Sequence, residues 1–190
     1  KLEEAIKCFD LVNDSTAVAK ALECTYFLEK YDDFNERLKV IANADPANLR
    51  VAAISAFAAH QLHQKDPYPY CVNPIELVKF SHIKKHVPDS NAFIASILNE
   101  LKAVNSVWEP RNQATKAGFQ TSNKLFSHPG ENMKILEDII KKELDLFRSE
   151  FKKNESTLIQ NWPDEVKIAA WYVRMLQGGH QDSHIHPNGW

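Results

Sequence analysis

The sequence predicts an α+β fold in which helices come first and strands come last. Three observations support this prediction. Apolar residues recur at helical spacing through residues 1–64, three prolines fall within residues 67–74, and alternating apolar residues return near the C-terminus. We therefore expect two domains, a helical one at residues 1–64 and a mixed one at residues 65–190.

Four helices are expected in the first domain. Their apolar faces contain, in chain order, Leu2, Ala5, Ile6 and Phe9; Val18, Ala21, Leu22, Thr25 and Leu28; Phe34, Leu38 and Ile41; and Val51, Ile54, Ala58 and Leu62. Residues 13–15 and 45–48 supply the polar side chains that favour helix N-termini. The second and fourth helices are therefore expected to begin at these points.

The helical pattern also repeats. Four apolar residues recur at a spacing of 32, Leu2, Ile6, Phe9 and Ala21 as Phe34, Leu38, Ile41 and Ala53. This spacing is close to the ~34-residue period of tetratricopeptide arrays, and the turn at residues 45–48 resembles the junction between such repeats. The resemblance implies helical hairpins that hold a peptide or protein partner on a concave surface. Fewer than three units are visible, so an ordinary helical bundle is an open alternative.

The second domain is expected to mix helices and strands. Helices are predicted at residues 91–104, behind a cap at Asp89-Ser90, and at residues 132–153. The second of these carries an apolar face of Ile135, Leu136, Ile139, Ile140, Leu144, Phe147 and Phe151. Strands are predicted at residues 118–121, 157–162 and 166–176, whereas residues 75–83 fit either a short helix or a strand.

Composition excludes several classes of function. The formal net charge of -2 gives no electrostatic reason to expect nucleic acid or a membrane surface as a partner. No apolar run approaches the ~20 residues that cross a bilayer. Cys8, Cys24 and Cys71 are widely spaced and fit reduced thiols, which predicts a cytoplasmic protein. The first residues lack a signal-peptide pattern and an initiator Met, so we expect the chain to come from a longer protein.

The end of the chain concentrates potential metal ligands. His180, Asp182, His184 and His186 lie within seven positions, directly after a strand-like run. Imidazole nitrogen is a ligand for Fe, Zn, Cu or Ni. Residues two apart share a face of an extended segment, so His184 and His186 form one candidate pair and His180 and Asp182 another. The residue pattern alone leaves both pairs open.

A resemblance to a known family adds to this pattern. Residues 171–190, WYVRMLQGGHQDSHIHPNGW, resemble the start of the catalytic core of Fe(II)/2-oxoglutarate-dependent oxygenases, which often follow tetratricopeptide repeats in bacterial proteins. The segments at 66–74, 90–94, 107–110 and 118–121 are similar to the N-terminal flank of that core. The resemblance covers about residues 66–190 and implies the first strands of a double-stranded β-helix, or cupin-like, domain. It also implies hydroxylation of a substrate, such as a protein or peptide side chain, with Fe(II), dioxygen and 2-oxoglutarate.

The resemblance further selects between the two pairs of ligands. Members of the superfamily place the first metal histidine five positions after a strand-ending glycine, which relates Gly179 to His184. The usual carboxylate position then falls on His186, a departure from the set of two histidines and one carboxylate. We therefore predict His184 and His186 as metal residues and assign no catalytic residue. The identity of the third ligand is left open.

The position of this motif limits what the chain is expected to do. It lies four residues before the end of the sequence, ahead of the segments that supply a distal histidine and a basic cosubstrate-binding residue in the resembling family. We expect the fragment to bind no iron stably and to be inactive, and whether it is an enzyme is left open. His60, His63, His82 and His86 are expected at the surface rather than as substitute ligands. The alternative function is a protein- or peptide-binding module.

Overall fold

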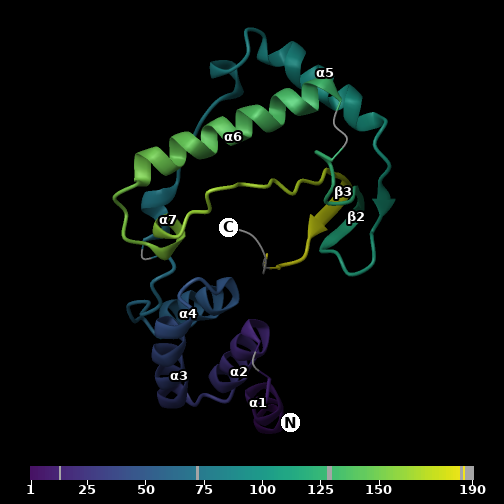
Figure 1. The fold of residues 1–190 in the computed structure, drawn as a ribbon. Helices are drawn as coiled ribbons and strands as arrows, with labels where there is room; N and C mark the ends of the chain where they lie inside the picture. The colour runs from purple at the N-terminus through teal and green to yellow at the C-terminus, as the bar shows by residue number, and fades with distance from the viewer. Residues whose placement is uncertain (13, 72, 128–129, 185, 187–190) are drawn as a thin grey trace. The chain divides into compact units, whose positions relative to one another are not determined.

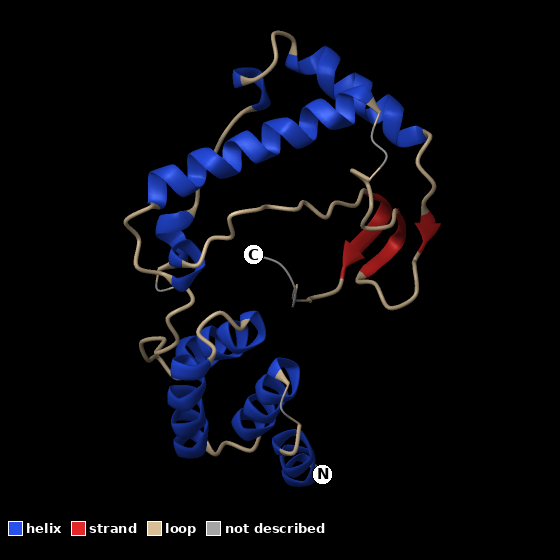
Figure 2. Cartoon of the chain, viewed as in Figure 1, coloured by secondary structure: helices blue, strands red, loops and turns tan. Residues whose placement is uncertain are grey.

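The computed structural model describes residues 1–12, 14–71, 73–127, 130–184 and 186, and its mixed helix and strand content confirms the α+β class (Figures 1 and 2). The chain divides into two compact units. Lys1–Val78, Phe151–Trp162 and the described residue His186 belong to the first unit, and Lys79–Glu150 and Pro163–His184 belong to the second. The first unit thus extends beyond the helical domain expected at residues 1–64.

The four predicted N-terminal helices are confirmed. They are α1 (Leu2–Asp10), α2 (Ser15–Phe27), α3 (Tyr31–Ala44) and α4 (Leu49–Gln61). Asp14 begins α2, and its side chain accepts the amides of Thr16 and Ala17 at 2.7 and 3.1 Å. Asn48 begins α4 in the same way and accepts the amides of the second and third residues after it at 3.1 and 3.2 Å. These bonds satisfy amide groups that a helix leaves unpaired at its first turn.

The helices α2 and α4 end alike as well as begin alike. Glu29 follows α2 with a φ of 59°, and His63 follows α4 with a φ of 52°. After α2, the amide of Lys30 donates to the carbonyl five residues earlier at 3.3 Å. After α4, the amide of Gln64 makes the equivalent hydrogen bond at 2.8 Å. Both caps and both left-handed residues are 34 positions apart, so the structural period of these helices is 34 rather than the 32 of the apolar pattern.

Two ion pairs connect α1 with α3. Lys30 Nζ lies 2.8 Å from Glu3 Oε1, and the Arg37 guanidinium donates to both carboxylate oxygens of Asp10 at 2.7 and 2.8 Å. The two pairs are seven residues apart on each helix, which is about two helical turns. The helices therefore run parallel, with equivalent turns side by side. These side chains are substantially exposed, so solvent screens both pairs and each contributes little to stability.

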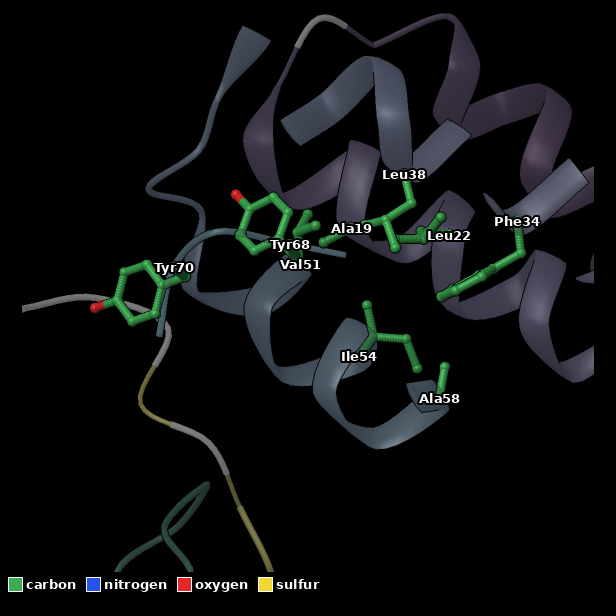
Figure 3. Close-up of a cluster of buried hydrophobic side chains, with 9 residues drawn as sticks. All are labelled: Ala19, Leu22, Phe34, Leu38, Val51, Ile54, Ala58, Tyr68 and Tyr70. Atoms are coloured by element: carbon green, nitrogen blue, oxygen red, sulfur yellow. The ribbon is translucent and has the colours of Figure 1, made fainter. Parts of the chain in front are cut away.

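A buried aromatic side chain closes the core of the first unit (Figure 3). The buried cluster consists of Ala19, Leu22, Phe34, Leu38, Val51, Ile54, Ala58, Tyr68 and Tyr70. The Tyr68 hydroxyl accepts the amide of Asn48 at 3.0 Å and donates to the carbonyl of Asp45. The Asp66 carboxylate accepts the Ser55 hydroxyl at 2.6 Å and the Tyr68 amide at 2.9 Å. These contacts explain why the proline-rich segment belongs to the helical unit.

The segment predicted as a strand at residues 157–162 is instead a short helix, α7 (Thr157–Gln160), so that prediction was wrong. The amides of Thr157 and Leu158 donate to the carbonyls of Pro69 and Tyr70, each at 3.0 Å. The following amides turn back onto carbonyls within the segment itself. Its first amides are thus satisfied by the proline-rich segment, and no strand partner is required.

The second unit combines two helices with a small sheet. Its helices are α5 (Ser90–Lys102) and α6 (Glu131–Phe151), although Phe151 itself belongs to the first unit. Its sheet is antiparallel, with the strand order β1 (Val107–Trp108), β2 (Thr115–Gln120) and β3 (Val173–Gln181). Short 3₁₀ turns occur at Pro74–Leu77, in the first unit, and at Ile83–Lys85. The helices predicted at 91–104 and 132–153 and the strand at 118–121 are confirmed in type. Among the described helices, none has both the length and the apolar content of a membrane-crossing segment.

Replacing Tyr68 by Phe tests how the core of the first unit is closed. The change removes a hydroxyl that satisfies a buried amide and a partly buried carbonyl. We expect Tyr68→Phe to lower the free energy of unfolding by about 1–3 kcal/mol, because unsatisfied buried polar groups are costly. Urea denaturation measures the change. Tyr31→Phe is the matched control, since Tyr31 is 36% exposed, and an equal loss in both variants would contradict the assignment.

Candidate functional site

The sequence-predicted site lies at the end of β3, which pairs irregularly with β2. His180 lies opposite Lys116, and Met175 lies opposite Gly118. The two positions on β2 are two residues apart, whereas their partners on β3 are five apart. Residues 176–179 therefore form a bulge, which interrupts the ladder before the histidines. The strand predicted at residues 166–176 accordingly begins later than expected and continues through Gln181.

Two glycines make this bulge possible. Gly178 has a φ of 80°, a backbone conformation that a residue with a Cβ adopts at a cost. A Cβ on Gly179 would lie 2.8 Å from the carbonyl oxygen of Ala117 and 2.9 Å from that of Leu176. Gly178 thus provides the turn, and Gly179 allows the two strands to approach closely.

Hydrogen bonds to β2 hold the end of β3. The Gln181 side chain donates to the Thr115 hydroxyl at 3.3 Å, and this hydroxyl donates to Gln120 Oε1 at 2.6 Å. The amide of Asp182 donates to the carbonyl of Ala114 at 2.9 Å. Thr115 is fully buried, so the chain enters the histidine-rich segment from a fixed position.

Asp182 lies between two potential cations. Its carboxylate is 3.4 Å from His180 Nε2 through one oxygen and 3.6 Å from Lys116 Nζ through the other. His180 Nδ1 lies 3.4 Å from the carbonyl oxygen of Gly178. All three side chains of this group are exposed, so their mutual attraction is weak. The alternative metal pair, His180 and Asp182, is thus engaged in a surface ion-pair cluster.

The two histidines predicted as metal residues follow this cluster and are both exposed. His184 Nδ1 is 2.8 Å from the carbonyl oxygen of Asp182. A carbonyl oxygen can only accept, so Nδ1 carries the proton and the lone pair of the neutral ring lies on Nε2. Such a bond often fixes the tautomer of a metal-binding histidine. Ile185, between the two histidines, and residues 187–190 lie outside the described residues.

The ligand set that Fe(II) requires can be compared with the described residues. Over residues 1–12, 14–71, 73–127, 130–184 and 186, no three His, Cys, Asp or Glu side chains form a group that could hold a metal ion. Two imidazoles do not make the three-ligand face typical of non-haem Fe(II) sites. His184 and His186 alone could supply at most two such ligands, and their role as metal ligands stays a prediction.

A second polar cluster was missed by the sequence analysis. His86, expected at the surface, has a side chain only 7% exposed, and its Nε2 lies 2.6 Å from Glu143 Oε1. The Ser81 hydroxyl donates to the same oxygen at 2.8 Å. The expectation for His86 was therefore wrong. Its partner is 57 residues away on α6, and no local sequence pattern relates the two.

Known proteins provide no independent identification. No protein-family model, curated protein or solved structure matches the chain. The family resemblance and the roles of His184 and His186 stay predictions.

Substituting the two glycines separately tests the bulge in β3. We expect Gly178→Ala to cost about 1 kcal/mol, because the added Cβ meets open space but the φ is left-handed. Gly179→Ala should cost more, because two backbone carbonyls would have to move. Urea denaturation gives the energies, and amide exchange in β2 and β3 locates the damage. A larger loss in Gly178→Ala than in Gly179→Ala would contradict this account.

Proposed function

We propose that this chain is the N-terminal part of a Fe(II)/2-oxoglutarate-dependent oxygenase that carries tetratricopeptide-type repeats. In the intact enzyme, Fe(II) and 2-oxoglutarate would supply the activation of dioxygen for hydroxylation of a substrate such as a protein or peptide side chain. This chain would contribute His184 as one metal ligand and His186 as a second ligand or as a close neighbour of the metal. β3 would be an early strand of the double-stranded β-helix.

The observation that carries the proposal is the position of His184 relative to the bulge. Gly179 requires the absence of a side chain, and His184 follows it by five positions, the spacing that the resemblance predicts. The hydrogen bond from His184 Nδ1 to a backbone carbonyl supports metal binding through Nε2. The ion pair of Asp182 with Lys116 supports the choice of His184 over the preceding carboxylate.

The period of the helical unit supports the repeat part of the proposal. The N-caps at Asp14 and Asn48 and the left-handed residues Glu29 and His63 are each 34 positions apart. A period of ~34 residues is that of tetratricopeptide units. The parallel arrangement of α1 and α3 is also expected when consecutive units stack with the same orientation.

Anaerobic titration with Fe(II), followed by isothermal calorimetry, tests the metal residues. We expect weak binding that is lost in His184→Ala, because removal of one of two imidazoles leaves a single ligand. His180→Ala is the matched control, since it removes an exposed histidine from the same segment. Binding that persists in His184→Ala but disappears in His180→Ala would assign the other pair.

The gene sequence after the Trp190 codon tests the family itself. We expect further strands followed by a histidine and a basic residue. A reading frame that lacks this later histidine would overturn the oxygenase proposal without affecting the helical unit.

A second candidate function, binding of a peptide or protein by the helical unit, is favoured by a pocket between α1, α2 and α3. This pocket has a volume of about 530 Å³, and its lining includes Leu11, Val12 and Val40. These side chains are 88%, 50% and 68% exposed, an unusual concentration of apolar surface. The paired Asp10 and Arg37 also line the pocket and would add polar contacts to a partner.

A charge placed in this pocket tests the second candidate. We expect Val40→Glu to abolish capture of a partner while changing the free energy of unfolding by less than about 0.5 kcal/mol, because the side chain is exposed. Affinity capture with quantitative mass spectrometry measures the loss. Val78→Glu is the matched control, since Val78 is 54% exposed and lies outside the pocket. A partner lost equally in both variants would count against this pocket.

A further inference from the structure

The second unit contains a pocket that the proposed oxygenase chemistry and the helical repeats do not use. Its volume is about 330 Å³, and it lies between the segment of residues 79–86 and one face of α6. The α6 wall consists of Leu136, Ile139, Ile140, Glu143, Leu144 and Phe147. Small-molecule sites typically have volumes of about 300–1,000 Å³ and apolar walls with a few polar groups. The pocket has this character.

The carboxylate of Glu143 is an acidic group in the lining of this pocket. Its Oε1 accepts the Ser81 hydroxyl at 2.8 Å and lies 2.6 Å from His86 Nε2. A carboxylate oxygen accepts, so the imidazole donates through Nε2. The two donors fix one carboxylate oxygen and hold the segment of residues 79–86 against α6. Because the two carboxylate oxygens belong to one rigid group, these contacts also fix the position of Oε2.

The carboxylate is charged at neutral pH. The hydrogen bond from Ser81, followed by that from His86, holds the pKa of Glu143 below its ordinary value, although burial opposes the shift. In the part of the chain that the structure describes, Glu143 Oε2 has no hydrogen-bond or ion-pair partner. Lys79 also lines the pocket; its ammonium group is 2.7 Å from Glu150, and its charge contributes to the lowered pKa of Glu143.

We propose that this pocket binds a small organic ammonium ion with an apolar body, such as an arylalkylamine. Its charged nitrogen would donate to Glu143 Oε2, because charge-assisted hydrogen bonds to a carboxylate are stronger than neutral ones. Its apolar body would lie against Ile139, Ile140 and Leu144, where burial of apolar surface favours binding. The assignment does not depend on iron, on 2-oxoglutarate or on His184.

Titration of the full chain with phenethylamine and with 2-phenylethanol tests the proposal. The two probes have the same aromatic body and similar size, but only the amine is charged. We expect the amine to bind at least about tenfold more tightly, since a hydrogen bond to a charged group is worth that much or more. Chemical-shift changes in ¹⁵N-labelled protein should fall on α6 and on residues 79–86. Equal affinities, or no shifts with the amine, would overturn the proposal.

Two variants make the test specific. Glu143→Gln keeps the shape of the side chain and removes its charge, so the amine should bind no better than the alcohol. Asp145→Asn is the matched control, because Asp145 is exposed on the same helix and does not line the pocket. The comparison of the two probes on the unaltered chain decides the question even where Glu143→Gln does not fold. Tighter binding of Nα-acetyl-lysine amide than of phenethylamine would assign the pocket to a protein side chain and overturn the small-molecule assignment.

Discussion

The first unit depends on the buried hydroxyl of Tyr68. It satisfies the carbonyl of Asp45 and the amide of Asn48 in the turn between α3 and α4. Asn48 in turn caps α4 and donates through its side chain to the carbonyl of Ser15 at the start of α2, at 3.0 Å. Through Asn48, the Tyr68 hydroxyl is thus linked by hydrogen bonds to the starts of both α4 and α2. Burial also raises the pKa of Tyr68 to about 12, so the hydroxyl keeps its proton, and thus its donor role, across the neutral range.

This constraint explains why the proline-rich segment does not separate the two units. Prolines stop the helical pattern, but the aromatic residues between them return the chain to the helical core. The Asp66 carboxylate fixes the start of this segment by accepting the Ser55 hydroxyl. The carbonyls of Pro69 and Tyr70 then accept the first two amides of α7. Residues far apart in sequence thus complete the unit, and its boundary is set by side-chain burial rather than by helix-breaking residues.

Elements with local signals were predictable from the sequence, and those that need distant partners were not. The starts of α2 and α4 follow from Asp14 and Asn48, whose side chains bond amides two and three residues away. α7 resembles a strand in composition, and its form depends on carbonyls almost 90 residues earlier. The histidine-rich segment was visible as a motif. The bulge at Gly179 and the buried bond between His86 and Glu143 depend on contacts that no local pattern contains.

The strength of the surrounding contacts decides which side chain of the C-terminal segment is the better candidate ligand. The ion pair of Asp182 with Lys116 is exposed and worth at most about 1 kcal/mol, so by itself it would not prevent the carboxylate from binding a metal. The hydrogen bond of His184 to a backbone carbonyl is a stronger argument, because it determines which ring nitrogen carries the lone pair. The hydrogen bond thus favours the tautomer whose Nε2 can bind a metal, whereas Asp182 already neighbours a cation. The spacing from Gly179 carries the preference for His184, and the hydrogen bond of its imidazole supports it more strongly than electrostatic competition at Asp182 does.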